Sequence, residues 1–339
     1  MDNKQINKQI RSISNRSSLL LLIFFAIDVP LKALLSYVYN YAPYGSVWQN
    51  EKLIFLLMEV GNYAIIFPVV FLVYYKCLNR KNGLRLKDTF QKSRRSKGWL
   101  LKWTVIAVGV TQLLHYIMLP LLNMIFQKNL SGGISLAAIN GKDDFLGWIL
   151  YGVPCILCAP FFEELLFRAT IFRNNEPMGQ LFASVVTGVA FGLWHTNINQ
   201  TFFAALMGVF LCLIYIKTRS IMSVMFVHFA NNLLSCALTF VRAQLGTILS
   251  TSDKEFMIEA MFDKQTGLAI ALTLIILLTI GVMIAGLTMF IVELVKTNGR
   301  LGLSKGEFPY NVRKKAFIFL SAPLTILLIV VLIVLTFAP

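Results

Sequence analysis

Residues 146–172 read LGWILYGVPCILCAPFFEELLFRATIF, an apolar run that contains three charged side chains near its end. A helix crosses the hydrocarbon core of a bilayer with about 20 mostly apolar residues, and this run is long enough to do so. The charged residues are Glu163, Glu164 and Arg168. Ionisable groups at membrane depth are costly and usually mark a functional site. The stretch therefore predicts a transmembrane helix that carries functional side chains.

The chain as a whole is also strongly apolar, since 57% of its 339 residues are hydrophobic. No segment alternates with the period of two that is typical of an outer-membrane barrel strand. The sequence predicts an all-α, polytopic integral membrane helical bundle of about nine transmembrane helices. These helices are expected near residues 18–39, 53–75, 100–126, 146–172, 180–197, 201–217, 221–242, 267–294 and 316–337.

The net charge of +15 is concentrated in three segments between or before the predicted spans. With nine spans and a cytoplasmic N-terminus, all three fall on the cytoplasmic face, as the positive-inside rule requires. We therefore expect these basic segments to set the orientation and to bind anionic lipids, and we exclude a nucleic-acid partner. Their basic residues are Lys4, Lys8, Arg11 and Arg16, then Lys76, Arg80, Lys81, Arg85, Lys87, Lys92, Arg94, Arg95 and Lys97, then Lys296, Arg300, Lys305, Arg313, Lys314 and Lys315.

The N-terminus combines a basic head with an apolar run, so a cleaved signal peptide has to be considered. Asp28, Pro30 and Lys32 interrupt that run, and no small-x-small cleavage site follows, so an uncleaved first span is the better interpretation. Asp28 and Lys32 are four residues apart and are expected to pair on one helix face. Short loops and Lys/Asn-rich polar segments suggest a bacterial plasma membrane.

The loops between the predicted spans divide the chain into three regions. Residues 1–98 hold two spans and a basic cytoplasmic linker, residues 99–242 form the membrane core, and residues 243–339 hold a loop and two C-terminal spans. The core contains the polar clusters. Residues 173–179 read RNNEPMG, which is typical of a turn between two antiparallel helices.

That turn places two polar residues at a similar membrane depth. Glu163 lies 16 residues before Gly179, and His195 lies 16 residues after it. His228 and Asn232 are four residues apart on a later span and so share one helix face. We therefore expect three neighbouring helices to bring these four side chains together.

A buried carboxylate beside imidazoles is the minimal apparatus for activating water. One Glu with two His is also a known zinc ligand set, so Glu163, His195 and His228 are candidate Zn ligands. The H-E-x-x-H motif of soluble metalloproteases is absent. Asn232 is a candidate donor to a developing oxyanion. Arg168 follows Glu164 by four residues and is expected to neutralise it.

At these residues the chain resembles the CPBP (CAAX-protease and bacteriocin-processing, or Abi) intramembrane proteases, which include the type II CAAX prenyl endopeptidases. Their signature is E-E-x-x-x-R, F-x-x-x-H and H-x-x-x-N on successive membrane helices. Here these motifs are Glu163-Glu164-x-x-x-Arg168, Phe191-x-x-x-His195 and His228-x-x-x-Asn232. Each motif is weak alone, but the three together in order are fairly specific. The resemblance covers residues 146–242.

The resemblance implies roles for these positions. Glu163 would activate water with His195 as its partner, His228 and Asn232 would stabilise the tetrahedral intermediate, and Glu164 with Arg168 would support the site. It also implies a membrane-associated peptide or protein as substrate: a prenylated C-terminus, or a bacteriocin or signalling-peptide precursor. The resemblance does not decide whether a metal takes part.

Simpler interpretations exist for each motif. Glu164 with Arg168 is also explained as a structural ion pair, His195 as a helix cap, and His228 with Asn232 as an interhelical hydrogen bond. A proton-coupled transporter is a second functional class, although the two related halves typical of transporters are missing. A non-catalytic bacteriocin self-immunity or scaffold protein is the third.

Other polar residues lie outside the three motifs. Cys155 and Cys158 have redox or metal spacing, but without a second pair they are better interpreted as buried thiols. His115, Glu59 and Asp28 are interpreted as structural or cavity-lining residues.

Overall fold

The computed structural model describes residues 2–78, 85–126, 144–245, 255, 259, 266–299 and 301–337. Within these residues the named elements are all helical. The α-helices are α1 (Asn3–Tyr41), α2 (Glu51–Val60), α3 (Phe67–Val73), α4 (Lys97–Phe126), α5 (Phe145–Val153), α6 (Ala159–Glu164), α7 (Arg173–Asn175), α8 (Gln180–Trp194), α9 (Ile198–Thr218), α10 (Ile221–Gln244), α13 (Thr266–Lys296), α14 (Val312–Leu320) and α15 (Pro323–Phe337).

Shorter π- and 3₁₀-helical pieces complete these elements. The π-helical pieces are η2 (Gly61–Ile66), η3 (Tyr74–Leu78), η5 (Pro154–Cys158) and η6 (Leu165–Phe172). The 3₁₀ pieces are η1 (Val47–Gln49), η4 (Leu86–Thr89) and η7 (Glu176–Met178). The π-helical pieces join α2 to α3 and α5 to α6, so two of the long membrane helices are continuous but locally underwound.

The prediction of an all-helical membrane bundle of about nine helices is confirmed. In the described part of the chain, seven helices are long and apolar enough to cross a membrane: Asn3–Tyr41, Glu51–Leu78, Lys97–Ile125, Phe145–Met178, Ile198–Thr218, Ile221–Gln244 and Thr266–Lys296. An eighth span is possible if α14 and α15, which are bent by 76° at their junction, count as one. The remaining predicted span, residues 180–197, corresponds to α8, whose 15 residues make it shorter than a full span.

Polar side chains begin several of these helices by capping their first backbone N–H groups. Asp2 and Gln5 form a capping box at the start of α1. Asn50 accepts from the first turn of α2, Asp144 from that of α5, and Asn197 from that of α9. Asn197 matters most for function, because it starts α9 directly after the end of α8.

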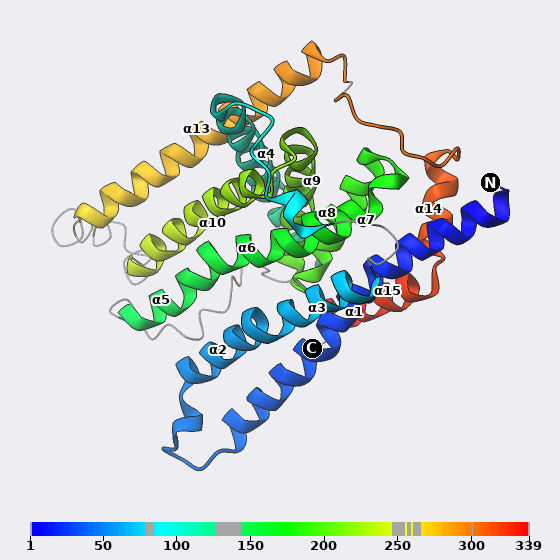
Figure 1. The fold of residues 1–339 in the computed structure, drawn as a ribbon. Helices are drawn as coiled ribbons and strands as arrows, with labels where there is room; N and C mark the ends of the chain where they lie inside the picture. Colours follow the sequence, from blue (N-terminus) through cyan, green and yellow to red (C-terminus); the bar gives the residue numbers. More distant parts are fainter. Residues whose placement is uncertain are drawn as a thin grey trace.

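Figure 1 shows the long helices in a series across the molecule. α1 lies beside α2 and α3, α5 and α6 lie between these and α10, and α10 packs against α13 (Figure 1). α4 packs against α9 and α13, and α8 packs against α9. The helix Phe145–Met178 therefore lies between the N-terminal helices and α10.

Glycines allow α8 and α9 to approach closely. Gly188 and Gly192 are four residues apart on α8, and a side chain at either would collide with α9. A Cβ at Gly188 would lie 2.7 Å from the carbonyl oxygen of Ala205, and one at Gly208 would lie 2.9 Å from the Cα of Gly188. This is the small-residue packing typical of membrane helices.

The predicted turn at residues 173–179 is present and ends at Gly179, whose φ of 109° is a conformation that favours glycine. Arg219, between α9 and α10, donates to the Glu176 carboxylate in this turn at 2.9 Å. This bond raises the pKa of Arg219 and fastens the hairpin to the next helical turn. Most of the segment between the third and fourth predicted spans and most of the loop after residue 243 lie outside the described residues, as do Arg80, Lys81 and Arg300.

Candidate active site

The two adjacent carboxylates, Glu163 and Glu164, end α6 and point to different surroundings. Neighbouring residues of a helix project about 100° apart, so one faces inward while the other faces a cavity. Glu164 is fully buried, and Glu163 is buried but lines the largest cavity near the motifs. The π-helical piece η6 follows immediately, and such pieces are frequent at functional sites.

Arg168 holds Glu164 in place. Its Nη1 donates to Glu164 Oε1 at 2.9 Å, and the side chains of both residues have no exposed surface. Its Nη2 donates to the carbonyl oxygen of Gly208 at 3.1 Å, and its guanidinium lies 4.7 Å from the centre of the Phe191 ring. The predicted ion pair is thus present, and it also links the helix of Glu164 to α8 and α9.

His228 connects the two carboxylates. Its Nδ1 lies 2.7 Å from Glu164 Oε1, and since the Arg168-paired carboxylate accepts, Nδ1–H is the donor. The other ring nitrogen, Nε2, lies 3.9 Å from Glu163 Oε2. His228 is therefore oriented by Glu164 and presents Nε2 toward Glu163, an arrangement that the spacing of the motifs alone does not reveal.

His195 caps α8 and also faces the cavity. Its Nδ1 donates to the carbonyl oxygen of Phe191 at 2.8 Å, one turn earlier. This leaves Nε2 for the cavity, which His195 lines. The next residue, Thr196, has a φ of 49°, which is uncommon for a β-branched residue and lets the chain turn sharply into α9. The capping and cavity-facing interpretations of His195 therefore both hold.

The Phe191 ring packs against both imidazoles and the Arg168 guanidinium. Its centroid lies 4.9 Å from that of the His195 ring and 5.8 Å from that of the His228 ring, and Arg168 covers it. Both imidazoles meet it edge to face. The ring thus limits the positions that the two imidazoles can take.

Asn232 donates a hydrogen bond to a backbone carbonyl that lacks a helical N–H partner. In η5 the Ala159 N–H bonds to the Pro154 carbonyl, so the Cys155 carbonyl would next need the N–H of residue 160. That residue is Pro160, which has no N–H. Asn232 Nδ2 donates to the Cys155 carbonyl oxygen at 2.8 Å instead.

The same contact fixes the neighbouring amide. Because Asn232 directs Nδ2 at Cys155, its Oδ1 points to Asn231, whose Nδ2 donates to it at 3.2 Å. The Oδ1 of Asn231 is buried and has no described hydrogen-bond donor, and Asn231 lines the cavity. The motifs do not include Asn231, and only its place beside Asn232 in an apolar helix pointed to it.

A cavity of about 560 Å³ joins these groups. Glu163, His195, His228 and Asn232 all line it, so the expectation that three helices bring them together is met. Glu164 and Arg168 lie behind it. The similar depth expected for Glu163 and His195 agrees with this common cavity.

The N-terminal helices form another wall of this cavity. Asp28 and Lys32 of α1 line it and form the expected ion pair, with 2.9 Å between Lys32 Nζ and Asp28 Oδ1. Glu59 of α2 lines it too, as do Asn62 and Tyr63 of η2. The interpretation of Asp28 and Glu59 as cavity-lining residues is confirmed, whereas no sequence motif indicated Asn62 and Tyr63.

Cys155 and Cys158 do not pair with each other. The Cys155 sulfur lies 3.2 Å from that of Cys236 on α10, and all three are free thiols. In the described structure Cys155 therefore contacts Cys236 rather than Cys158.

The site was also tested as a zinc centre. Glu163 Oε2 and the Nε2 atoms of His195 and His228 are chemically suitable donors, and each imidazole bonds through its other nitrogen, as metal ligands do. Within the described residues, however, no three His, Cys, Asp or Glu side chains are arranged to hold a metal ion. The zinc set Glu163, His195 and His228 therefore stays a prediction.

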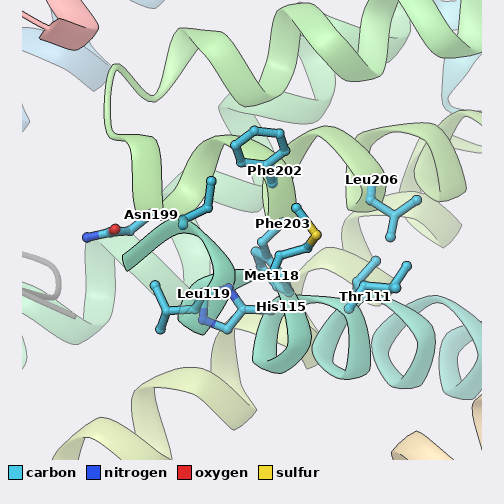
Figure 2. Close-up of a pocket in the computed structure, with 10 residues that line it drawn as sticks. Thr111, His115, Met118, Leu119, Asn199, Phe202, Phe203 and Leu206 are labelled. Carbon is cyan, nitrogen blue, oxygen red and sulfur yellow. The ribbon is translucent and has the colours of Figure 1, made fainter. Parts of the chain in front are cut away.

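A second, smaller cavity of about 190 Å³ lies between α4 and α9 (Figure 2). Its lining is mostly apolar and includes His115, which packs edge to face on Phe203 with 5.5 Å between ring centres. Phe203 also lines the larger cavity. His115 is therefore a cavity-lining residue apart from the three motifs, as expected.

Comparison with known proteins places the motifs in one matched region. Residues 145–234 match the family model described as Type II CAAX prenyl endopeptidase Rce1-like. The UPF0177 protein YbdI of Lactococcus lactis subsp. lactis is 27% identical over 178 residues, which cover 51% of this chain and 92% of that protein. The UPF0177 protein YaiH of the same organism is 35% identical over 94 residues, which cover 26% and 38%. No solved structure matches the chain.

The resemblance inferred from the three motifs is thus confirmed for residues 145–234. This region is similar to the Rce1-like type II CAAX endopeptidases, and the similarity supports an activity of the intramembrane endopeptidase kind. The N-terminal wall of the cavity lies outside the match.

Proposed function

We propose that this protein hydrolyses a peptide bond in a membrane-associated peptide or protein, with Glu163 as the base that activates water. The observation that carries the proposal is the pair Glu163–His228, buried in a membrane-embedded cavity and backed by Glu164 and Arg168. Water in such a cavity has few competing partners, so each polar contact to it is stronger than in bulk water.

The proposed reaction begins with a water molecule between Glu163 and His195 Nε2. Glu163 Oε2 takes a proton from the water as its oxygen attacks the carbonyl carbon of the substrate. The carbonyl oxygen becomes an oxyanion. His228, when protonated at Nε2, donates to it together with the second N–H of Asn232. Glu163 then passes the proton to the leaving nitrogen and the C–N bond breaks. A carboxylic acid and an amine result, and the acid proton then moves to the amine to give a carboxylate and an ammonium group.

The surrounding residues serve this chemistry by position. Glu164 orients His228 in the way that a buried carboxylate orients the histidine of a hydrolytic triad. Arg168 holds the Glu164 carboxylate in position. Asn231 offers a buried acceptor, Oδ1, to a backbone N–H of the bound peptide.

For the substrate we propose a bacteriocin or signalling-peptide precursor, or a CAAX-type C-terminus, in a bacterial plasma membrane. The membrane-embedded cavity supports a substrate that reaches it from the bilayer. The match to a CAAX endopeptidase family and the two bacterial relatives support this choice.

The test compares peptide termini in the membranes and medium of cells that carry wild-type protein or Glu163→Gln at matched expression. New termini present only with the wild type would support the proposal and identify the substrate. If a deletion has a phenotype that Glu163→Gln rescues while no terminus changes, a self-immunity or scaffold role replaces it.

A further inference from the structure

A basic groove of about 830 Å³ runs along the first turns of α1, among residues that do not line the catalytic cavity. Four cations line it: Lys4, Lys8, Arg11 and Arg16. Its apolar lining comes from three different helical elements: Leu19 of α1, Leu78 of η3 and Leu324 of α15. None of these seven residues belongs to the matched family region.

Helical spacing explains how the groove is polar at one end and apolar at the other. Lys4, Lys8, Arg11 and Leu19 follow one another at intervals of three, four or eight residues, so they lie along one face of α1. Moving along this face, the side chains change from cationic to aliphatic. A ligand with an anionic head and an apolar tail is complementary to this change from cationic to aliphatic side chains.

The cations of the groove are available to a ligand. Lys4, Lys8 and Arg11 are exposed, and no described carboxylate forms an ion pair with them. No acidic residue is found among the described residues that line the groove. Arg16 is held by Ser12, to which its Nη2 donates at 3.1 Å. Asn7 adds a buried Oδ1 that no described donor meets, which suits a hydroxyl of the ligand.

The groove lies on the part of α1 that precedes its apolar run, where the positive-inside rule places the cytoplasmic membrane surface. Basic residues there attract anionic lipids, by about fivefold in affinity for each Lys or Arg. We propose that the groove binds an anionic phospholipid. The cations contact its phosphate, Asn7 accepts from a headgroup hydroxyl, and Leu19, Leu78 and Leu324 contact an acyl chain. This proposal is independent of the peptidase activity.

The test uses the purified full-length protein in phosphatidylcholine nanodiscs, titrated with phosphatidylglycerol that carries a fluorescent acyl chain. Lys8→Gln/Arg11→Gln removes two groove cations and is expected to weaken binding by about 25-fold. The matched control, Lys92→Gln/Lys97→Gln, removes two exposed charges outside the groove on the same predicted face and should weaken binding much less than the groove variant does. Thermal unfolding of each variant confirms that it is folded.

Two further arms separate a lipid site from a phosphate site. Leu19→Gln should weaken phosphatidylglycerol binding, and inorganic phosphate should not displace the lipid. Equal weakening by the groove and control variants would show that only general surface charge attracts the lipid and would overturn the proposal. Displacement by inorganic phosphate, with no effect of Leu19→Gln, would overturn it as well.

Discussion

The guanidinium of Arg168 joins three groups that the sequence places far apart: the Glu164 carboxylate, the Gly208 carbonyl and the Phe191 ring. All of them are buried. Removing one partner from such an arrangement leaves an uncompensated charge, which costs much more than the net contribution of the intact pair. Arg168 therefore has a structural role even though it lies in a catalytic motif.

Arg168→Met should destabilise the protein by about 3–5 kcal/mol, because it strands the Glu164 carboxylate in a low dielectric. Glu164→Gln combined with Arg168→Met removes both charges and should lose less stability than Arg168→Met alone. Thermal unfolding of the variants in one detergent measures this. A double variant that is as unstable as the sum of the two single ones would contradict the coupling of the pair.

Asn232 has a structural task that is separable from its proposed catalytic one. Asn232→Ala leaves the Cys155 carbonyl without a donor and should cost about 1–3 kcal/mol. Pro160→Ala supplies a backbone N–H for this carbonyl, so Pro160→Ala/Asn232→Ala should recover much of the stability. Peptide hydrolysis should remain impaired in the double variant, since the oxyanion still lacks its donor. Restored activity would show that Asn232 acts through structure alone.

In the proposed mechanism the Glu163 carboxylate activates the water without a metal ion. This mechanism predicts that hydrolysis by the purified protein continues at an unchanged rate after dialysis against a strong zinc chelator. Glu163→Gln serves as the inactive reference in the same assay. Loss of activity on chelation, followed by recovery with added Zn²⁺, would contradict this expectation and restore the zinc hypothesis.

At the scale of helices, the site depends on how closely α8 and α9 approach. Gly188 and Gly192 let the backbones touch, and this brings the Gly208 carbonyl within reach of Arg168. It also seats Phe191 between the two imidazoles. The helix pair is thus a frame for the site as well as a packing unit.

Gly192→Leu should push α9 away from α8, because even a Cβ at this position collides with the Thr201 carbonyl. We expect the variant to lose about 1–3 kcal/mol of stability, as overpacking typically does. We also expect lower activity, because Phe191 and the Gly208 carbonyl move relative to Arg168. Gly281→Leu on α13 is the control, because a Cβ there meets nothing within 4 Å. If both variants behave like wild type, the close approach of α8 and α9 is not needed for the site.

Local spacing predicted the contacts that follow helix geometry. The interval of four residues gave the Glu164–Arg168 and Asp28–Lys32 pairs, and symmetry about Gly179 gave the common cavity of Glu163 and His195. The bond from Asn232 to Cys155 could not be predicted, because it depends on the π register of η5. The contact of His228 with Glu164 depends on the rotation of α10, which hydropathy does not specify.

At the scale of the whole molecule, residues from outside the matched family region also line the cavity. Asp28, Lys32 and Glu59 come from α1 and α2, yet they line the same cavity as Glu163. Hydropathy predicted these two helices but not their position, because side-chain packing between distant segments decides which helices are neighbours. The N-terminal helices are thus placed to contact substrate near the site.

The central claim is that Glu163 activates the water that cleaves the peptide. The most direct measurement compares purified wild-type protein and Glu163→Gln in identical nanodiscs, with the peptide found from the changed termini and with ¹⁸O-labelled water. We predict that the wild type yields a new carboxyl group containing ¹⁸O, whereas Glu163→Gln unfolds at a similar temperature and yields no product. Cleavage by Glu163→Gln at the wild-type rate would contradict the claim.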